Sequence, residues 1–313
     1  MNKLLKKPNV VAVGKGHKLI SGVDTGRNAI VVCVTHKVPI NALRKSQIIP
    51  LKYRGIETDV IETGEIRALR TTKHRPAPGG VSIGHYAITA GTLGMVVRKD
   101  GKRYILSNNH VLANSNDAVM GDSIYQPGPA DGGGKTDTIA ILTGFVPIEF
   151  SGASDCPIGG LVVRVWNFLA ELLGRRTRLE ATFQGINKVD CALAEPIEGA
   201  EVSDEILEVG TPIGFAGVNV GTLIKKSGRT TELTHGAVTI TDVEVTVNYG
   251  TGTAVFEDQL ITSNISAGGD SGSVVLNEDN EVVGLLFAGS DTVTIVNKID
   301  NVINALGLDA MIP

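Results

Sequence analysis

A serine flanked by glycines stands out in the last quarter of the chain, in the sequence SAGGDSGS at residues 266–273. Glycine lets the backbone turn tightly and bring its own N–H groups close to a ligand. Acyl transfer needs this arrangement, because two backbone donors beside a nucleophilic serine stabilise the oxyanion of the tetrahedral intermediate. We predict Ser271 as the nucleophile, with an oxyanion hole made by the N–H groups of Gly269 and Ser271. A simple Gly–Ser loop has the same composition, so this prediction needs partners elsewhere in the chain.

A histidine and an aspartate supply the partners that a nucleophilic serine requires. A hydroxyl is a weak nucleophile until a base takes its proton and a third group orients that base. His110 stands at the end of an apolar, strand-like run over 104–106, and Asp190 is embedded in apolar sequence over 189–194. Three other aspartates lie in polar, loop-like sequence: Asp117, Asp122 and Asp137. Because apolar neighbours shield a carboxylate, we predict His110 as the base and Asp190 as its orienting group.

The order His110, Asp190, Ser271, at spacings of 80 and 81 residues, resembles that of the trypsin-like (chymotrypsin-fold) serine peptidases. The sequence Ser-Asn-Asn-His-Val around the base is most similar to the bacterial HtrA/Deg branch. The resemblance implies a mainly β fold, with two Greek-key six-stranded β-barrels over residues 80–313 and a C-terminal helix. It places His110 and Asp190 in the first barrel and Ser271 in the second. It also implies a serine endopeptidase that works through an acyl-enzyme intermediate on protein or peptide substrates, with no metal and no cofactor.

Two features depart from the family's pattern. HtrA-type peptidases carry a peptide-binding PDZ domain after the peptidase, and only 40 residues follow Ser273, so we expect no such domain. Trypsin-type zymogens release an N-terminus whose amine pairs with the aspartate beside the serine, which is Asp270 here. Residues 81–84, Val-Ser-Ile-Gly, resemble that terminus only faintly. The partner of Asp270 is therefore left open.

Alignment of the serine motif with the trypsin-like pattern, residue by residue, suggests a substrate pocket. The family's residue at the base of the primary pocket lies six positions before the serine, which is Ile265, and the pocket wall falls on Phe287, Ala288 and Gly289. All four residues are uncharged, so they cannot select a lysine or arginine side chain. We predict cleavage after small or medium apolar residues. In the alternative, Ile265 packs in the core and the pocket lies elsewhere.

Composition sets limits on the class of protein. The chain has 313 residues, 42% of them hydrophobic and 20% charged, as in ordinary globular proteins. The net charge of −4 gives no indication of nucleic-acid binding. The N-terminus lacks the apolar run of a signal peptide, and no run reaches the ~18 apolar residues of a membrane span. We therefore expect a soluble cytoplasmic protein, with homo-oligomers left open.

Residues 1–75 differ in pattern from the rest of the chain. Strand-like runs cover 10–14, 29–34 and 56–61, turn-like sequence covers 22–28, and one or two helical turns fit within 39–47. We predict a small α/β domain, or else a pro-segment that folds onto the catalytic part. The prolines and glycines of residues 76–80 mark its boundary.

From residue 80 onward, short strands alternate with glycine-rich turns, and two helices interrupt them. Apolar residues recur at helical spacing over 161–173, where Arg164, Asn167 and Glu171 take the other side and three arginines follow: Arg175, Arg176 and Arg178. This inserted amphipathic helix either binds a membrane or a partner, or packs on its own domain. A second helix is predicted over 299–306, ended by Gly307.

Two other functions remain open alongside the endopeptidase. A trypsin-like fold can serve as a catalytically silent binding or structural module, although such a module has no use for all three residues of the site. An esterase acting on non-peptide acyl groups would use the same residues with the same chemistry.

Overall fold

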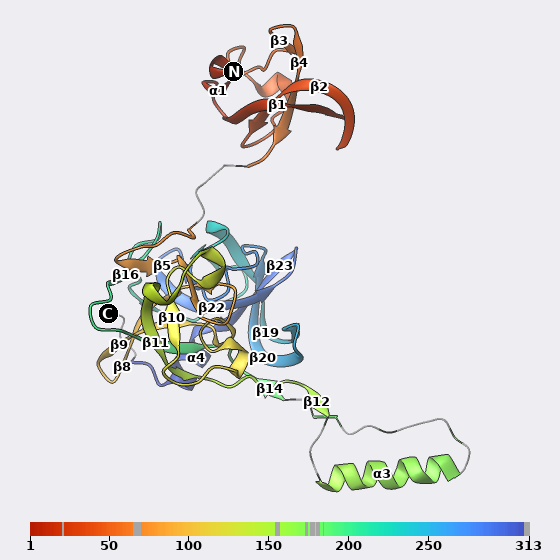
Figure 1. Ribbon diagram of the computed structural model, residues 1–313, viewed down its shortest axis with the longest axis vertical. Helices are drawn as coiled ribbons and strands as arrows, with labels where there is room; N and C mark the ends of the chain where they lie inside the picture. Colours follow the sequence, from red (N-terminus) through yellow and green to blue (C-terminus); the bar gives the residue numbers. More distant parts are fainter. Residues whose placement is uncertain are drawn as a thin grey trace. The chain divides into compact units, whose positions relative to one another are not determined.

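The computed structural model describes residues 1–309 except 21, 65–69, 154–156, 173–174, 176–178, 180–181 and 184. The chain divides into two compact units, Met1–Ala68 and Leu69–Pro313 (Figure 1). Each unit has its own hydrophobic core, and each is described by itself.

The first unit is a four-stranded sheet with one short helix, α1 (Asn2–Leu5). Its strands run in the order β1 (Val10–Ile20), β2 (Val23–Val34), β4 (Ile56–Glu62) and β3 (Lys52–Tyr53), and a 3₁₀ turn, η1, covers Ile40–Ala42. The alternating residues Ile30, Val32 and Val34 of β2 bury one face against Leu4 of α1. This is the small α/β extension expected from the sequence. The turn predicted over 22–28 is shorter than expected: Gly22 is a turn residue, but residues 23–28 belong to β2, with Gly26 at a φ of 67° inside the strand.

The second unit begins with a β-barrel. Its strands are β6 (Ser82–His85), β7 (Gly91–Thr92), β8 (Met95–Lys99), β9 (Lys102–Ser107), β10 (Ser123–Tyr125), β11 (Thr138–Phe145) and β15 (Ala192–Pro196), in the sheet order β7-β6-β10-β11-β15-β9-β8. Only Leu93 and Gly94 separate β7 from β8. That single stretch pairs with β6 at one end and with β9 at the other, and so closes the sheet on itself.

A second barrel follows in the chain. It consists of β18 (Leu223–Gly228), β19 (Glu232–Asn248), β20 (Thr253–Ser263), β21 (Val274–Asn277), β22 (Glu281–Gly289) and β23 (Val293–Lys298). Because β23 pairs with both β20 and β22, the sheet is a closed ring. Two short strands, β14 (Ile186–Asn187) and β17 (Gly214–Phe215), extend it in parallel.

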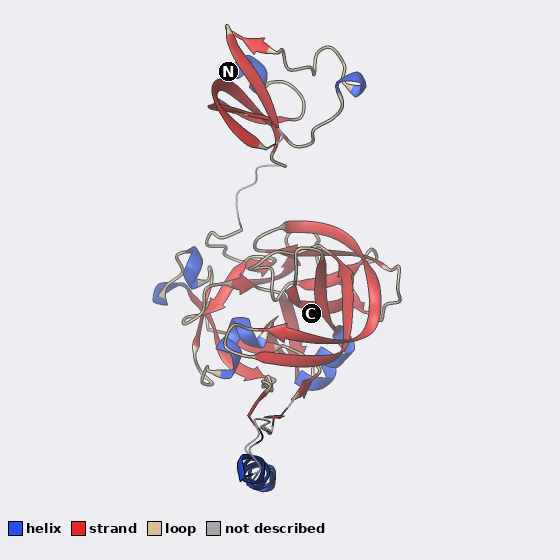
Figure 2. Ribbon diagram, turned by 90° about the vertical axis from the view of Figure 1, so that its right-hand side faces the viewer, coloured by secondary structure: helices blue, strands red, loops and turns tan. Residues whose placement is uncertain are grey.

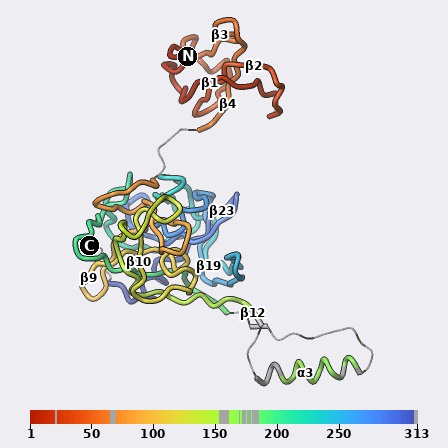
Figure 3. The backbone as a smooth tube through the Cα atoms, in the orientation of Figure 1, coloured from red at the N-terminus to blue at the C-terminus, as the bar shows by residue number. Residues whose placement is uncertain are grey.

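The two barrels share one topology. When β7 and β8 are taken as one strand and each barrel's six strands are numbered along the chain, the neighbours in space run 1-2-3-6-5-4 in both. This order is a Greek key repeated twice, as the sequence resemblance implied. Figure 2 shows how strongly strands dominate this unit. Figure 3 shows β9 and β10 of the first barrel on one side of the unit and β19 and β23 of the second on the other.

A shared core joins the barrels. Met95 and Leu106 of the first barrel and Val274 and Leu276 of the second belong to one buried cluster. The C-terminal helix α4 (Ile299–Leu306) adds Ile299, Val302 and Leu306 to it, and Gly307 ends the helix with a φ of 64°. The predicted C-terminal helix is therefore confirmed, together with its apolar spacing.

Short elements complete the second unit. β5 (Ala77–Gly79) pairs with β16 (Val202–Ile206), and β12 (Gly152–Ala153) pairs with β13 (Thr182–Phe183). The helices are α2 (Asn109–Leu112) and α3 (Pro157–Leu172), with 3₁₀ turns η2 (Asn114–Asn116), η3 (Pro129–Asp131) and η4 (Lys135–Asp137). The inserted helix of the prediction is α3; residues 173, 176 and 178 of that prediction lie outside the described part. No helix that the structure describes is long and apolar enough to cross a membrane.

The segment just before the barrels is held on the second unit. The Ser82 N–H donates to the Arg70 carbonyl at 3.0 Å, and the His74 N–H donates to Gln126 Oε1 at 2.9 Å. The Arg70 side chain is buried and contacts Ser227 and Glu208. Residues 70–76 therefore belong to the second unit by their contacts, although sequence composition groups them with the first.

Candidate active site

His110 and Asp190 are brought together by strand pairing. β9 ends at Ser107, the chain turns at Asn108 into α2, and His110 is the second residue of that helix. β15 pairs with β9, which places the residues just before β15 beside the start of α2. The His110 Nδ1 lies 2.6 Å from Asp190 Oδ2, and the His110 backbone N–H donates to Asp190 Oδ1 at 3.2 Å.

Asp190 is fully buried, and groups from both barrels surround it. The Asn108 side-chain amide donates to its carbonyl at 2.8 Å. From the second barrel, the Tyr249 hydroxyl donates to Asp190 Oδ2 at 2.8 Å, and the Asp190 N–H donates to Asn297 Oδ1 at 3.0 Å. Burial and the nearby Asp190 charge raise the pKa of Tyr249 well above its ordinary value, so its hydroxyl remains a neutral donor. Sequence reasoning missed Tyr249 and Asn297, because nothing local marks either residue as a partner of a carboxylate some 60 to 110 positions away.

We expect Tyr249→Phe to lower kcat/KM by about tenfold, since a hydrogen bond to a charged group contributes roughly 1.5–3 kcal/mol, part of which Asp190 regains from the two remaining donors on His110. Steady-state kinetics of peptide hydrolysis measure this change in kcat/KM. Tyr53→Phe, in the first unit, is the matched control. An unchanged kcat/KM in Tyr249→Phe would show that this donor does not support the histidine.

The Ser271 loop joins β20 to β21 and depends on glycine. Gly269 and Gly272 have φ values of 99° and 94°, which side chains rarely tolerate. A Cβ on Gly272 would lie 2.0 Å from the Ser107 hydroxyl, so that hydroxyl would have to move. Neither the Gly269 N–H nor the Ser271 N–H donates a hydrogen bond to any described residue. Both donors are therefore available for a ligand. The Ser271 hydroxyl lies 3.5 Å from the Phe287 carbonyl.

Threonine contacts fasten this loop to the first barrel. In β7, the Thr92 N–H donates to the Ser271 carbonyl at 2.8 Å, and the Thr92 hydroxyl donates to the Gly269 carbonyl at 2.9 Å. Gly91 is packed so closely that an added Cβ would lie 2.5 Å from Val111 of α2 and 3.0 Å from the Ser271 carbonyl. Only the backbone of β7 therefore lies between helix α2, which carries His110, and the loop that carries Ser271.

His110 and Ser271 border two adjoining hollows. The first, of about 580 Å³, is lined by His110, Tyr249 and Phe287 together with residues of β19. The second, of about 400 Å³, is lined by Ser271, Leu286 and the polar residues Asn264, Ser266 and Asp291. Both hollows share Ala288, Gly289 and Ser290 along the end of β22.

One of the four predicted pocket residues lies away from both hollows. Ile265 is 2% exposed and packs with Ile224 and Val238 in the core of the second barrel, so it does not line the hollow beside Ser271. Its side chain points inward, and Asn264 and Ser266 on either side of it line that hollow instead. Phe287 borders the hollow beside His110. Ala288 and Gly289 border both.

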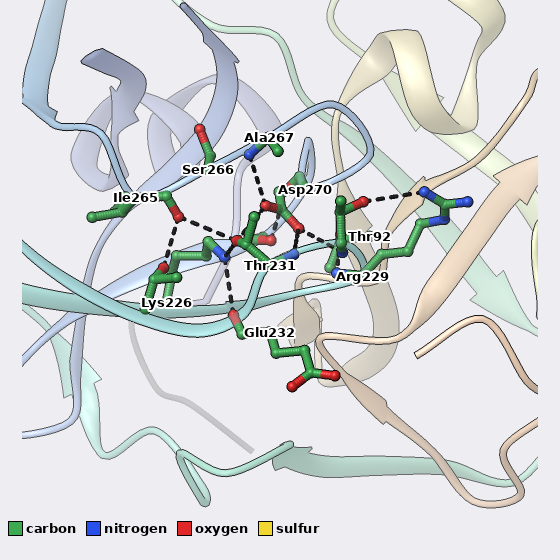
Figure 4. Close-up of polar contacts among 12 residues, drawn as sticks. Thr92, Lys226, Arg229, Thr231, Glu232, Ile265, Ser266, Ala267 and Asp270 are labelled. Carbon is green, nitrogen blue, oxygen red and sulfur yellow. Dashed lines mark hydrogen bonds and ion pairs between the residues drawn. The ribbon is translucent and has the colours of Figure 1, made fainter. Parts of the chain in front are cut away.

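The partner of Asp270 is a buried lysine (Figure 4). Both side chains are fully buried, and the Lys226 Nζ lies 3.4 Å from Asp270 Oδ2. Asp270 also accepts from the backbone N–H groups of Thr230 at 2.8 Å and Thr231 at 3.1 Å, and from the Ala267 N–H at 3.0 Å. The Ala267 contact closes the start of the loop that carries Ser271. An internal cation therefore occupies the role that the sequence left open.

Burial lowers the pKa of Lys226 to about 8, and the Asp270 carboxylate opposes that shift. The Lys226 ammonium also donates to the Glu232 carbonyl at 3.0 Å and to the Thr231 hydroxyl. Sequence reasoning missed Lys226, since two adjacent lysines read as exposed. One signal was available: in a strand, Lys226 shares its face with the apolar Ile224, whereas Lys225 points the other way.

Comparison with known proteins identifies the family. Residues 91–285, well over half of the chain, match the model of the trypsin-like peptidase domain. The chain is 53% identical over 71 residues to glutamyl endopeptidase 2 of Streptomyces griseus, a stretch that covers 23% of this chain and 30% of that protein. The chain therefore spans less than a third of that relative's length.

Solved structures with a similar backbone include two bacterial proteases. The chymotrypsin of Cellulomonas bogoriensis has a TM-score of 0.47 and 17% identity, over 76% of this chain and 99% of that chain. Protease A of Thermobifida fusca has a TM-score of 0.48 and 15% identity, over the same shares. The family match runs from the start of β7 into β22 and so takes in strands of both barrels. On that ground, this chain belongs to the trypsin-like peptidases.

Proposed function

We propose that the chain is a serine endopeptidase that uses Ser271, His110 and Asp190. The observation that carries the proposal is the hydrogen bond of 2.6 Å between His110 Nδ1 and the buried Asp190 carboxylate, beside the loop of Ser271. With Nδ1 engaged, Nε2 is the nitrogen left to accept a proton from the serine. The family match and the similarity to an endopeptidase support the same function.

The reaction would proceed in two halves. In the first, Ser271 Oγ attacks the scissile carbonyl and His110 Nε2 takes its proton, while the N–H groups of Gly269 and Ser271 stabilise the oxyanion. The C–N bond then breaks, and His110 returns the proton to the leaving amine. In the second half, water attacks the acyl-enzyme with His110 again as the base, which releases the acid and restores Ser271. Asp190 holds the imidazole in the useful tautomer and stabilises its protonated form.

Labelling with a fluorophosphonate probe tests the nucleophile. We expect one adduct per chain, on Ser271, because the proposed mechanism gives that hydroxyl His110 as its base and two free backbone donors for the oxyanion. Ser271→Ala should lose the adduct, and Ser266→Ala, in the same loop, should keep it. Peptide mapping by mass spectrometry locates the modified residue. An adduct on another serine would overturn the assignment, and labelled protein that hydrolyses esters but not peptides would identify an esterase.

The hollow beside Ser271 suggests which residue precedes the cleaved bond. No lysine, arginine or histidine lines it among the described residues, and Gly268, Ala288 and Gly289 leave it wide enough for a small or medium side chain. Asp291 lies at this hollow and is exposed. We infer a preference for uncharged residues such as Ala, Val or Leu on the acyl side.

A second specificity, for glutamate, is favoured by a different observation. The relative with 53% identity over 71 residues is named a glutamyl endopeptidase. In this chain, Asn264, Ser266 and Ser290 line the hollow with an amide and two hydroxyls. Such neutral donors can hydrogen-bond a carboxylate without a cation.

Cleavage of a peptide library distinguishes these specificities. For an apolar pocket we expect a graded preference, because each methylene contributes only about 1–3 kcal/mol of discrimination. For a pocket built to bind glutamate we expect a steep preference for Glu over Gln, which Ser266→Ala and Ser290→Ala should reduce. A dominant preference for Lys or Arg would exclude both.

A further inference from the structure

Helix α3 (Pro157–Leu172) exposes a large apolar surface. Five of its apolar side chains are each more than half exposed: Leu161, Val162, Val165, Trp166 and Phe168. Water-soluble proteins rarely leave such a contiguous patch uncovered unless it meets a partner or a membrane. The exposed arc of α3 is therefore a candidate binding surface.

The distribution of polar residues on α3 is narrow. Arg164, Asn167 and Glu171 follow one another at spacings of three and four, so they lie along a single stripe of the helix. The exposed apolar residues occupy the remaining arc. At 16 residues, the helix is also shorter than the ~20 that a membrane span requires. A helix too short to span, with its exposed apolar residues on one arc and its polar residues on the other, can lie in the interface of a bilayer with the polar stripe turned toward water.

A second copy of α3 would cover this surface less completely. Leu161, Val165 and Phe168 have the spacing of a coiled-coil seam and could pair with another helix. Val162 and Trp166 lie outside that seam and would stay in water. A bilayer covers all five residues at once, and tryptophan is favoured at the level of the lipid headgroups.

The charge of this segment is opposite to that of the whole chain. Residues 157–178 contain four arginines and a single glutamate, whereas the chain carries a net charge of −4. Three of those arginines directly follow the helix in sequence: Arg175, Arg176 and Arg178. Basic residues beside an amphipathic helix attract anionic lipid headgroups. We propose that α3 binds the surface of an anionic lipid bilayer and holds the peptidase there without spanning the membrane.

The chain contains one tryptophan, Trp166, so its fluorescence reports on α3 alone. Added to the full chain, vesicles of equimolar phosphatidylcholine and phosphatidylglycerol should shift the emission to the blue and carry the protein with them on flotation. Vesicles of phosphatidylcholine alone should bind it at least tenfold more weakly, and high salt should reduce the difference. Absence of both the shift and flotation with the anionic vesicles would overturn the proposal.

Acidic substitutions on the exposed apolar arc of α3 should weaken membrane binding without affecting folding or catalysis. We expect Leu161→Glu with Phe168→Glu to lower the partition onto anionic vesicles at least tenfold, while hydrolysis of a soluble peptide stays unchanged. Ile213→Glu adds a charge at another exposed apolar residue, 71% exposed, and should bind vesicles as the parent does. If the parent chain is instead a dimer that ignores vesicles, and the double variant is a monomer, the surface is an interface between copies and the membrane proposal is wrong.

Discussion

His110→Ala should abolish labelling by a fluorophosphonate and lower kcat/KM for a peptide by about 10⁴–10⁶-fold. The histidine is the only base in hydrogen-bonding reach of Asp190 among the described residues. In the proposed mechanism, the Ser271 hydroxyl keeps its proton when this base is removed. Asp190→Asn should lower kcat/KM about 10⁴-fold, because the amide favours the wrong tautomer of the imidazole. Single-turnover hydrolysis and gel-based labelling measure both effects.

A second histidine supplies a matched control for this result. His85 Nε2 also lies 3.0 Å from a carboxylate, that of Asp122, but its side chain is buried and borders neither hollow of the site. The folded fraction of His85→Gln should retain kcat/KM within a few-fold. Should His110→Ala still label while His85→Gln does not, the roles of the two pairs would be reversed.

Lys226→Met should destabilise the fold and disable the site together. Removing one partner of a buried ion pair typically costs about 3–5 kcal/mol, because the other charge is left in an apolar environment. Here that charge is Asp270, which organises the loop of the two proposed oxyanion donors, so we expect kcat/KM to fall by about 10²–10³-fold. Urea unfolding and peptide hydrolysis measure the two losses.

The neighbouring lysine is the control for Lys226. Lys225→Met removes a half-buried lysine from the other face of β18 and should leave both quantities nearly unchanged. Combining Lys226→Met with Asp270→Asn should recover much of the free energy of unfolding, since no unpaired charge remains. A Lys226→Met protein with normal activity would show that the ion pair does not organise the loop.

The same lysine should limit activity at alkaline pH. Burial lowers its pKa to about 8, against an ordinary value of 10.5, so the folded protein loses this proton before the unfolded chain does. Between about pH 8 and pH 10.5, the unfolded chain holds this proton more often than the folded protein does. The contribution of Lys226 to the free energy of unfolding therefore rises with pH over that range. Asp270 loses its counter-charge over the same range. We expect kcat/KM to fall above about pH 8 with no loss of folding stability from this group, and Lys226→Met to lack that alkaline limb.

The fold and part of the site could be predicted from sequence, because local patterns carried the information. Short strands and glycine turns indicated a mainly β fold, and the resemblance to the trypsin-like peptidases implied its two barrels. The apolar setting of Asp190 indicated a buried carboxylate. The Ile265 prediction shows the limit of counting along a motif. An offset of six residues locates a position on the backbone, but the local conformation of the loop after β20 decides which side chains face the hollow. Here they are those of Asn264 and Ser266.

Long-range partners were beyond sequence reasoning for another reason. Tyr249 and Asn297 meet Asp190 only because the second barrel packs against the first, and neither has a neighbour that signals this contact. Lys226 would have required knowledge that β18 buries one face. Tyr249 and Asn297 are specified by the docking of two barrels, which no single segment encodes, whereas the partners of Lys226 lie within the second barrel.

The hydrogen bonds of Thr92 link the formation of the proposed site to the folding of both barrels. This residue belongs to the first barrel, yet it holds the carbonyls of Gly269 and Ser271 in the second. The nucleophile loop can therefore take its working shape only after both barrels have formed and met. Contacts between segments this distant in sequence carry a cost in loop-closure entropy, which slows folding. The proposed nucleophile is therefore organised only in the folded chain, and an incompletely folded chain lacks the proposed active site.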